Sequence, residues 1–346
     1  MQSLSGHPVT SWWNDRVVAS GSAATDLSDP DAAGSTVRAA LDAGLLDLPL
    51  PGCGATAERW SALAALAGAD VTLAKLAEAH ADAVAVLAEL GAPGPGTGEL
   101  WAVWAAVTPL LRARIGPDGR WRLDGRKPWA SGSSCCDHAL VTAVGPDGER
   151  LFAVDLAAAV TTPEPDSWPA VAMSGTRSVT LGFDAVAAAP VGGPGAYVDR
   201  PGFLLGGAGI AACWYGGAAG VALPLLGRVA AGTKDDPHRD AHLGAVHTAL
   251  TAARCALDEL ARTVDGRVAA DLTALTSTVR ALAERTATEV VDRVGRALGP
   301  GPLATDRAHG RRVADLTLFV RQSHAERDLA ALGRHVAAAG SPSVRW

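Results

Sequence analysis

The stretch Gly202–Leu226 constrains the fold of this chain more than any other feature of its sequence. It holds seven glycines, one proline and no charged residue, and its length would allow it to cross a membrane. Neither end carries a basic cluster, and there is no aromatic belt beyond Trp214 and Tyr215. We therefore expect a buried core helix that packs closely against other helices through small side chains.

Composition and charge favour a cytoplasmic protein with a large core. The length of 346 residues suits two or three packed units. Because 48% of the residues are apolar and 19% are charged, the chain can bury a large core. The formal net charge of −6 argues against a nucleic-acid partner, because phosphate binding requires a basic face. The N-terminus lacks the basic start and apolar centre of a signal peptide. We expect no membrane association.

The five cysteines show no metal-ligand spacing. Cys135 and Cys136 are adjacent, which suits neither a zinc site nor Cys-x-x-Cys redox chemistry. We therefore expect no metal centre, and free thiols in a reducing compartment.

The periodicity of apolar residues changes twice along the chain. Residues 1–98 have helical spacing, most clearly at 35–43, 58–66 and 70–90, and end in the glycine- and proline-rich segment Gly91–Gly98. Residues 99–198 contain short alternating segments. The turns Pro117–Gly119 and Pro146–Gly148 each separate two of them, as in a β-hairpin. The sequence predicts an N-terminal helical domain followed by an antiparallel, barrel-like β-domain.

Residues 199–346 return to helical spacing. Asp271 and Asp306 stand where helix N-caps belong, and four long helices with short connections predict an antiparallel bundle. The expected helices are 202–231, 241–265, 271–297 and 306–338.

Three local motifs in this layout resemble the acyl-CoA dehydrogenase superfamily. Trp121–Val144 is similar to the family segment in which a strand ends in Lys-x-Trp and a hydroxyl residue. Met173–Val186 resembles the following strand pair, and Ala297–Leu316 resembles the late turn of the family. The resemblance implies an α+β fold of the acyl-CoA dehydrogenase type, FAD as cofactor, and a homodimer or homotetramer.

The resemblance also implies positions for the flavin. Trp129 would lie against the isoalloxazine ring, Ser131 would supply the hydroxyl near its N5 atom, and Trp104 and Thr108 would belong to the cofactor site. The flat apolar face of an aromatic residue at a strand end, next to a hydroxyl and free backbone amides, suits such a ring. The alternative is that Trp129 is a core aromatic residue and Ser131 an ordinary turn residue.

Two departures from the family pattern concern the chemistry. The segment around Thr108 lacks the glutamate and the Gly-Ser-Asp that help to hold flavin and CoA phosphates, and the acidic segment Ala230–Asp240 replaces another cofactor-binding turn. The late turn Gly299–Arg307 has no glutamate, and the helix expected at 202–231 has no carboxylate. The usual proton acceptor for α,β-desaturation is therefore missing.

Three other residues are candidates for the site. His324 lies near the position of a histidine in the flavin monooxygenase branch, and His80 lies on a helix that flanks the substrate cavity in the family. Arg200 stands where dehydrogenases place an arginine for CoA. A histidine can exchange a proton near neutral pH. Each of the three could equally be structural, His324 and Arg200 as members of surface ion pairs and His80 beside an apolar face.

Three functions remain open at this point. The first is an FAD-dependent oxidoreductase acting on an acyl thioester or a related small molecule. The second is a flavin-dependent monooxygenase or oxidase of the same fold. The third is a non-catalytic descendant.

Overall fold

The computed structural model describes residues 6–20, 26–106, 110–232, 236–267 and 271–340. The chain divides into two compact units, which we call the helical unit and the sheet unit. The helical unit comprises Met1–Ala19, Pro49–Ala74 and Leu204–Trp346, and the sheet unit comprises Ser20–Leu48 and Lys75–Phe203. The division into three domains at 1–98, 99–198 and 199–346 stays a prediction.

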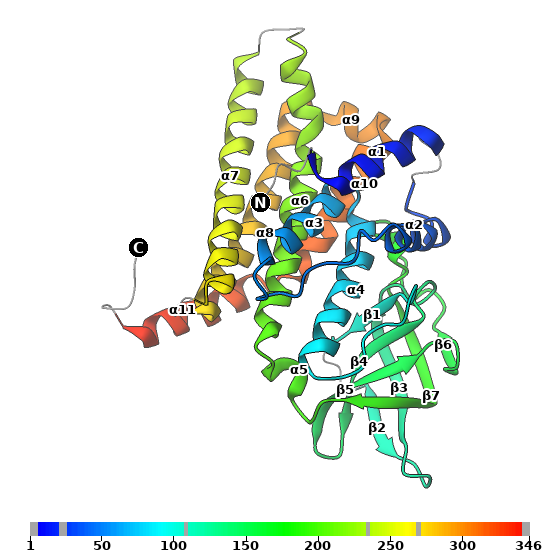
Figure 1. Cartoon of the computed structure of the whole chain (residues 1–346). Helices are drawn as coiled ribbons and strands as arrows, with labels where there is room; N and C mark the ends of the chain where they lie inside the picture. Colours follow the sequence, from blue (N-terminus) through cyan, green and yellow to red (C-terminus); the bar gives the residue numbers. More distant parts are fainter. Residues whose placement is uncertain (1–5, 21–25, 107–109, 233–235, 268–270, 341–346) are drawn as a thin grey trace. The chain divides into compact units, whose positions relative to one another are not determined.

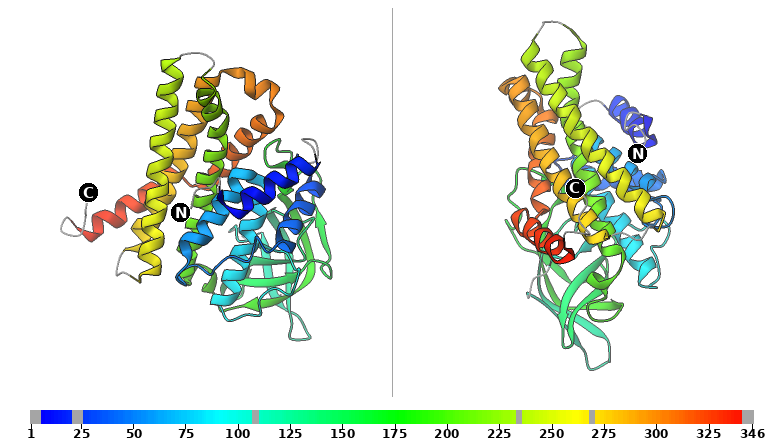
Figure 2. Two further views of the ribbon diagram at one scale, coloured as in Figure 1. Left: turned by 45° about the horizontal axis from the view of Figure 1, so that its top comes forward. Right: turned by 90° about the vertical axis from the view of Figure 1, so that its left-hand side faces the viewer.

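The helical unit is built around three long helices (Figure 1). Its α6, α7 and α8 run side by side, and α11 leaves them at a steep angle, as the two further views also show (Figure 2). The helices of this unit are α1 (Pro8–Ser20), α3 (Thr56–Ala69), the first turn of α4 (Val71–Glu89), α6 (Gly202–Ala230), α7 (Pro237–Asp265), α8 (Leu272–Leu298), α9 (Pro300–Thr305), α10 (Arg307–Phe319) and α11 (Glu326–Ala339).

Helix α6 is the core helix of this unit. A Cβ atom added at Gly216 would lie 2.0 Å from the carbonyl oxygen of Ala64, and one at Gly220 would lie 2.7 Å from that of Gly68. Only glycine permits this approach of the α6 backbone to α3. By length and composition α6 could span a membrane, with a mean hydropathy of 1.5 over its most apolar window, but 72% of that window is buried inside the protein. This burial is what we expect of a core helix.

The late-turn motif forms a buried ion network in the helical unit. The guanidinium group of Arg311 pairs with Asp70 and with Asp315, the latter at 2.9 Å. Asp70 also accepts the main-chain N–H of Thr72 at 2.9 Å, and so caps α4. The network therefore ties α10 to the corner between α3 and α4.

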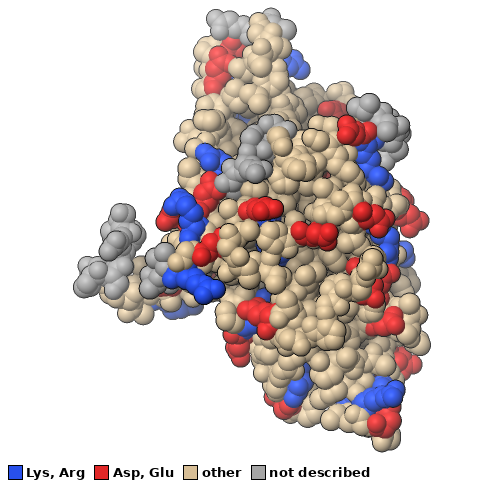
Figure 3. Space-filling model, viewed as in Figure 1, with Lys and Arg blue, Asp and Glu red and all other residues tan. Residues whose placement is uncertain are grey.

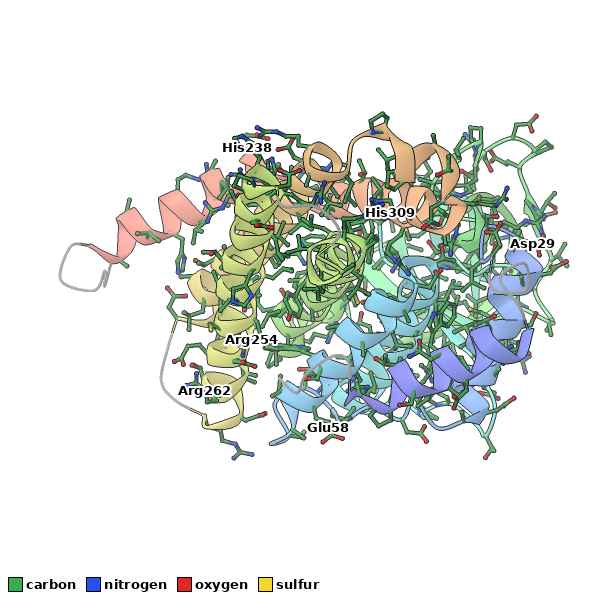
Figure 4. The ribbon with its side chains drawn as sticks, turned by 90° about the horizontal axis from the view of Figure 1, so that it is seen from above. Asp29, Glu58, His238, Arg254, Arg262 and His309 are labelled. Carbon is green, nitrogen blue, oxygen red and sulfur yellow. The ribbon has the colours of Figure 1, made fainter. Side chains whose placement is uncertain are left out.

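Within its described residues, the sheet unit contains seven strands and three helices. Asp29 caps its helix α2 by accepting the N–H groups of Asp31 and Ala32, and lies at the start of that helix (Figure 4). The elements are α2 (Pro30–Asp42), most of α4, β1 (Trp101–Trp104), β2 (Leu111–Ile115), β3 (Trp121–Ala130), β4 (His138–Gly145), β5 (Gly148–Asp155), β6 (Thr161–Pro163), β7 (Val179–Val191), α5 (Ala196–Asp199) and the 3₁₀ turn Ser174–Thr176.

The strand pairings of the sheet unit close into a ring. Strands β2 and β3 pair antiparallel around the first Pro-Asp-Gly turn, and β4 and β5 pair antiparallel around the second, which confirms both predicted hairpins. Strand β3 pairs with β7, β7 with β5, and β4 with β2. Because β4 runs parallel to both β1 and β2, the sheet is mixed, and the prediction of an antiparallel domain was wrong on this point.

Two further differences concern the helices. Helix α1 lies within the predicted helical segment 1–98, although no individual helix was expected at its position, and the single helix expected at 306–338 is divided into α10 and α11. Ser323 is extended, with φ −66° and ψ 134°, and so ends the helical geometry after the 3₁₀ turn Val320–Gln322, while Asp328 accepts the main-chain N–H of His324 at 3.1 Å. In contrast, Asp271 and Asp306 are both N-caps, as predicted.

A fully buried lysine lies at the centre of the sheet unit. The ammonium group of Lys127 on β3 donates to the carbonyl oxygen of Ala106 at 2.9 Å, and to the carbonyl and hydroxyl oxygens of Thr142 on β4 at 2.8 Å each. Burial lowers the pKa of Lys127 to about 8. Three acceptors match its three N–H bonds, so this group joins β3, β4 and the segment after β1.

Replacing Lys127 by Met should destabilise the protein strongly. The substitution keeps the length of the side chain but leaves two buried carbonyl oxygens without this donor, at a cost of about 2–4 kcal/mol. Urea unfolding monitored by tryptophan fluorescence measures the change. Arg114→Met is the control, because Arg114 forms an exposed ion pair with Asp124, and such pairs contribute about 1 kcal/mol or less. Equal losses in the two variants would contradict the assigned role.

Candidate functional site

A large aromatic side chain is exposed at the end of β3. Trp129 is 59% exposed, and its backbone has φ 63°, a left-handed conformation that is rare for a bulky residue. The pairing of β3 with β7 shifts register between Lys127 and Ala130. Such a bulge turns a side chain away from the regular face of a sheet and is common beside active sites. The structure therefore presents the indole outward, and the alternative of a core aromatic residue does not hold.

A second tryptophan fixes the position of the first. The rings of Trp129 and Trp168 meet edge to face, with centroids 5.8 Å apart and an interplanar angle of 78°. The indole N–H of Trp168 donates to the carbonyl oxygen of Met173 at 3.3 Å. Edge-to-face contact restrains one edge of the Trp129 ring. Trp168 was not singled out from the sequence, because no local pattern indicates a contact 39 residues away along the chain.

Ser131 lies two residues after Trp129 and belongs to a cluster of hydroxyl groups. Its Oγ is 2.6 Å from Oγ of Ser178, which is 2.8 Å from Oγ1 of Thr176. Thr176 is the last residue of the 3₁₀ turn Ser174–Thr176, which precedes β7. The residues that flank this turn, Met173 and Arg177, both have left-handed backbone conformations. Ser178 and Thr176 were also not singled out, although both lie within the Met173–Val186 motif.

The remaining predicted cofactor residues are Trp104 and Thr108. Trp104 on β1 is fully buried, and its indole N–H donates to the carbonyl oxygen of Ser131 at 2.9 Å. It therefore supports Ser131 from behind. Thr108 lies outside the described residues.

His80 on α4 is buried and has a structural partner. Its Nδ1 accepts the main-chain N–H of Trp101 at 3.2 Å, which ties α4 to the first residue of β1. Burial lowers the pKa of His80 to about 4, while the nearby carboxylate of Asp47 acts in the opposite direction. The imidazole is therefore neutral near pH 7. Its predicted catalytic role stays a prediction.

Arg200 and His324 are both placed beside carboxylates. Arg200 is buried in the sheet unit, with 3.0 Å to Glu89 and 3.4 Å to Asp82, and its guanidinium group lies over the ring of Tyr197 at 5.3 Å. His324 belongs to the helical unit, has 58% of its side chain exposed, and lies 3.4 Å from Asp328. Carboxylates therefore lie beside both side chains without a ligand, although among the described residues the buried Nε of Arg200 has no hydrogen-bond partner. Substrate binding by Arg200 and catalysis by His324 stay predictions.

Metal-binding groups and surface charge bear on two further expectations. Among the described residues, no group of three or more His, Cys, Asp or Glu side chains could hold a metal ion. Figure 3 shows acidic and basic side chains interspersed over a mostly uncharged face. The expectation of no nucleic-acid partner stays a prediction.

Comparison with known proteins identifies the fold. No family model and no curated protein matches the chain. Among solved structures, dibenzothiophene monooxygenase (TdsC) from Paenibacillus sp. A11-2 matches with a TM-score of 0.70 and 19% identity, over 92% of this chain and 98% of that one. It has also been solved with FMN bound, and with FMN and indole.

Two further structures support the same fold. The 3-HSA hydroxylase from Rhodococcus sp. RHA1 has a TM-score of 0.75 and 16% identity, over 96% of this chain and 98% of that one. A steroid acyl-CoA dehydrogenase variant has a TM-score of 0.70 and 21% identity, over 96% of this chain and all of that one. The chain therefore has the acyl-CoA dehydrogenase-like fold, as the three motifs predicted.

The buried imidazole of His80 should make the protein sensitive to acid. The pKa of His80 in the folded protein lies below the ordinary value of 6.5. As the pH falls, the unfolded chain therefore binds a proton at His80 before the folded protein does. The contribution of His80 to the free energy of unfolding is complete above about pH 6.5 and is lost as the pH falls towards 4. We expect a loss of about 2 kcal/mol from this group between pH 7 and pH 5.

Urea unfolding at the two pH values measures this loss in the wild-type protein and in His80→Asn. An asparagine can accept the N–H of Trp101 but takes up no proton in this range. The variant should therefore lose about 2 kcal/mol less than the wild-type protein. An identical loss would show that His80 does not set the acid sensitivity.

Proposed function

We propose that this protein is a flavin-dependent monooxygenase with the acyl-CoA dehydrogenase-like fold. The observation that carries the proposal is the outward face of Trp129, which is held in a left-handed conformation two residues before Ser131. Exposure of a large aromatic ring costs hydrophobic free energy, and a site that stacks a flat ligand gives that exposure a purpose. The monooxygenases among the structural neighbours support the reaction class.

The residues of this chain fit a flavin ring. Trp129 offers a stacking face, Trp168 restrains that face, and Ser131 places a hydroxyl group at the same end of β3. A bound flavin, once reduced, would supply the activation of dioxygen for transfer of one oxygen atom to a small organic substrate. Trp104 and Lys127 would keep the wall in place, because they fix Ser131 and the segment after β1 respectively.

FMN is the flavin that we propose, in place of the FAD expected from the resemblance. The Gly-Ser-Asp that would help to hold flavin phosphates is missing, and Asp235 and Asp236 stand in the sequence where the family has a cofactor-binding turn. Carboxylates at this place oppose the binding of a pyrophosphate, although Arg239 pairs with Asp236 at 3.0 Å. TdsC, which has the same fold, has been solved with FMN. FAD is the second outcome of the binding test below.

The dehydrogenase reaction has less support than the monooxygenase reaction. Helix α6 contains no Asp or Glu, and the turn Gly299–Arg307 contains no Glu. Asp306, the carboxylate in that turn, is used as the N-cap of α10, where it accepts the N–H of His309 at 3.0 Å. Desaturation of an acyl thioester requires a base beside the flavin. Flavin binding distinguishes a non-catalytic role from the dehydrogenase and the monooxygenase, because both enzymes require a bound flavin.

Removing the indole of Trp129 should weaken flavin binding. Stacking contributes about 0.5–1.5 kcal/mol beyond the area that is buried, so together with the lost area we expect Trp129→Ala to raise the dissociation constant of FMN at least about tenfold. Equilibrium titration of the purified protein with FMN and with FAD, each oxidised and reduced, gives the constants.

Trp12→Ala is the matched control for that titration. Trp12 is a half-buried tryptophan on α1 in the helical unit, and its loss should leave flavin binding unchanged. Absence of binding by the wild-type protein would overturn the proposed function. Equal affinity of the wild-type protein and Trp129→Ala would remove Trp129 from the site.

A further inference from the structure

Three hydroxyl groups, the first of them on Ser131 two residues after Trp129, form a chain that ends at a main-chain carbonyl. Oγ of Ser131 lies 2.6 Å from Oγ of Ser178, which lies 2.8 Å from Oγ1 of Thr176. Oγ1 of Thr176 lies 2.8 Å from the carbonyl oxygen of Met173. All these distances are in the range of good hydrogen bonds. The chain runs from Ser131, at the proposed flavin wall, into the protein.

The carbonyl at the inner end sets the direction of the protons. Each hydroxyl has a single proton to donate, whereas a carbonyl oxygen can only accept. If Thr176 donates to Met173, then Ser178 must donate to Thr176, and Ser131 must donate to Ser178. All three protons are then used inside the protein, and the oxygen of Ser131 retains a lone pair for an external donor.

The opposite direction is possible but forms one hydrogen bond fewer within the protein. Thr176 would then donate to Ser178, Ser178 to Ser131, and Ser131 would donate outward. The carbonyl of Met173 would lose the hydroxyl of Thr176, although it still accepts the main-chain N–H of Thr176 at 3.1 Å and the indole of Trp168 at 3.3 Å. The inward direction is therefore the more stable one when no external acceptor is present.

The other polar groups of Ser131 are already in use. Its N–H donates to the carbonyl oxygen of Trp129 at 2.9 Å, and its carbonyl oxygen accepts the indole N–H of Trp104 at 2.9 Å. The hydroxyl oxygen is thus the group with which Ser131 can meet a ligand. Whether this oxygen accepts or donates depends on Ser178 and Thr176.

We propose that this hydroxyl chain makes Ser131 a hydrogen-bond acceptor and thereby selects reduced over oxidised flavin. The inference rests on the proposed function. Atom N5 of a reduced flavin carries a proton and donates, whereas N5 of an oxidised flavin accepts. With N5 facing Ser131, as the resemblance implies, an acceptor at Ser131 matches the reduced ring directly. Donation to the N5 atom of an oxidised flavin requires the proton of Ser131 to leave Ser178, which costs one hydrogen bond within the protein whether or not Ser178 and Thr176 also reverse. Ser178 and Thr176 are thus positioning residues.

The expected preference follows from the one hydrogen bond that reversal costs. A net contribution of this kind corresponds to a factor of about three to ten in an equilibrium constant. The ratio of the dissociation constant of oxidised FMN to that of reduced FMN should therefore be about three to ten times larger in the wild-type protein than in a variant whose hydroxyl chain is interrupted. For a two-electron couple a factor of ten corresponds to a midpoint potential about 30 mV higher.

Two substitutions interrupt the chain at different points. In Ser178→Ala the proton of Ser131 loses its inner acceptor and can donate outward. In Thr176→Val the proton of Ser178 loses its inner acceptor and can donate to Ser131, whose own proton then turns outward. Both variants should lower the ratio of the oxidised to the reduced FMN dissociation constant about three- to tenfold, with a matching fall in the midpoint potential of the bound flavin.

The control is Ser174→Ala. Ser174 lies in the same 3₁₀ turn, but its hydroxyl donates to the carbonyl oxygen of Ser28 at 2.7 Å. Its loss tests whether a general disturbance of the turn changes the ratio. Anaerobic titration of each variant with FMN and with dithionite-reduced FMN gives both constants, and a redox titration of the bound flavin gives the potential.

The outcomes separate the two claims. A lower ratio in Ser178→Ala and Thr176→Val, with an unchanged ratio in Ser174→Ala, supports the selection of reduced flavin. Binding of FMN with the same ratio in all four proteins overturns this inference and leaves the proposed function standing. A wild-type protein that binds neither FMN nor FAD, in either redox state, overturns both.

Discussion

The candidate site depends on the buried ammonium group of Lys127. A charge without water is costly unless every N–H bond finds an acceptor, and here three oxygens from Ala106 and Thr142 supply them. This requirement fixes β3 against β4 and holds the segment after β1. Because Lys127 lies two residues before Trp129, its hydrogen bonds hold β3 in place just before the strand becomes irregular. The bulge can then turn the indole outward without loosening the strand.

Beyond Lys127, the geometry of the site rests on conformations that regular strands do not use. Trp129, Met173 and Arg177 all have positive φ values, and each such residue costs free energy that the surrounding contacts must offset. The edge-to-face contact with Trp168 and the hydroxyl chain to Thr176 are those contacts. The same residues that stabilise the turn therefore decide how Ser131 presents its hydroxyl group. Folding and recognition use one set of interactions here.

The sequence predicted the features that depend on local chemistry. Both Pro-Asp-Gly hairpins and the N-caps at Asp271 and Asp306 follow from residues within a few positions of one another. The parallel pairing of β1 with β4 was not predicted, because parallel strands are matched by contacts between residues that lie far apart in the sequence. For the same reason the sequence could not show the partner of His80, which is 21 residues away, or the hydroxyl chain, in which Ser178 lies 47 residues from Ser131.

The central claim is that the exposed face of Trp129 is a flavin wall formed by the folded sheet unit. A crystal structure of the protein soaked with FMN tests it most directly. The account predicts the isoalloxazine ring stacked on Trp129, with N5 within hydrogen-bond distance of the hydroxyl group of Ser131. A ring bound elsewhere, or an indole face covered by another part of the chain, would contradict it.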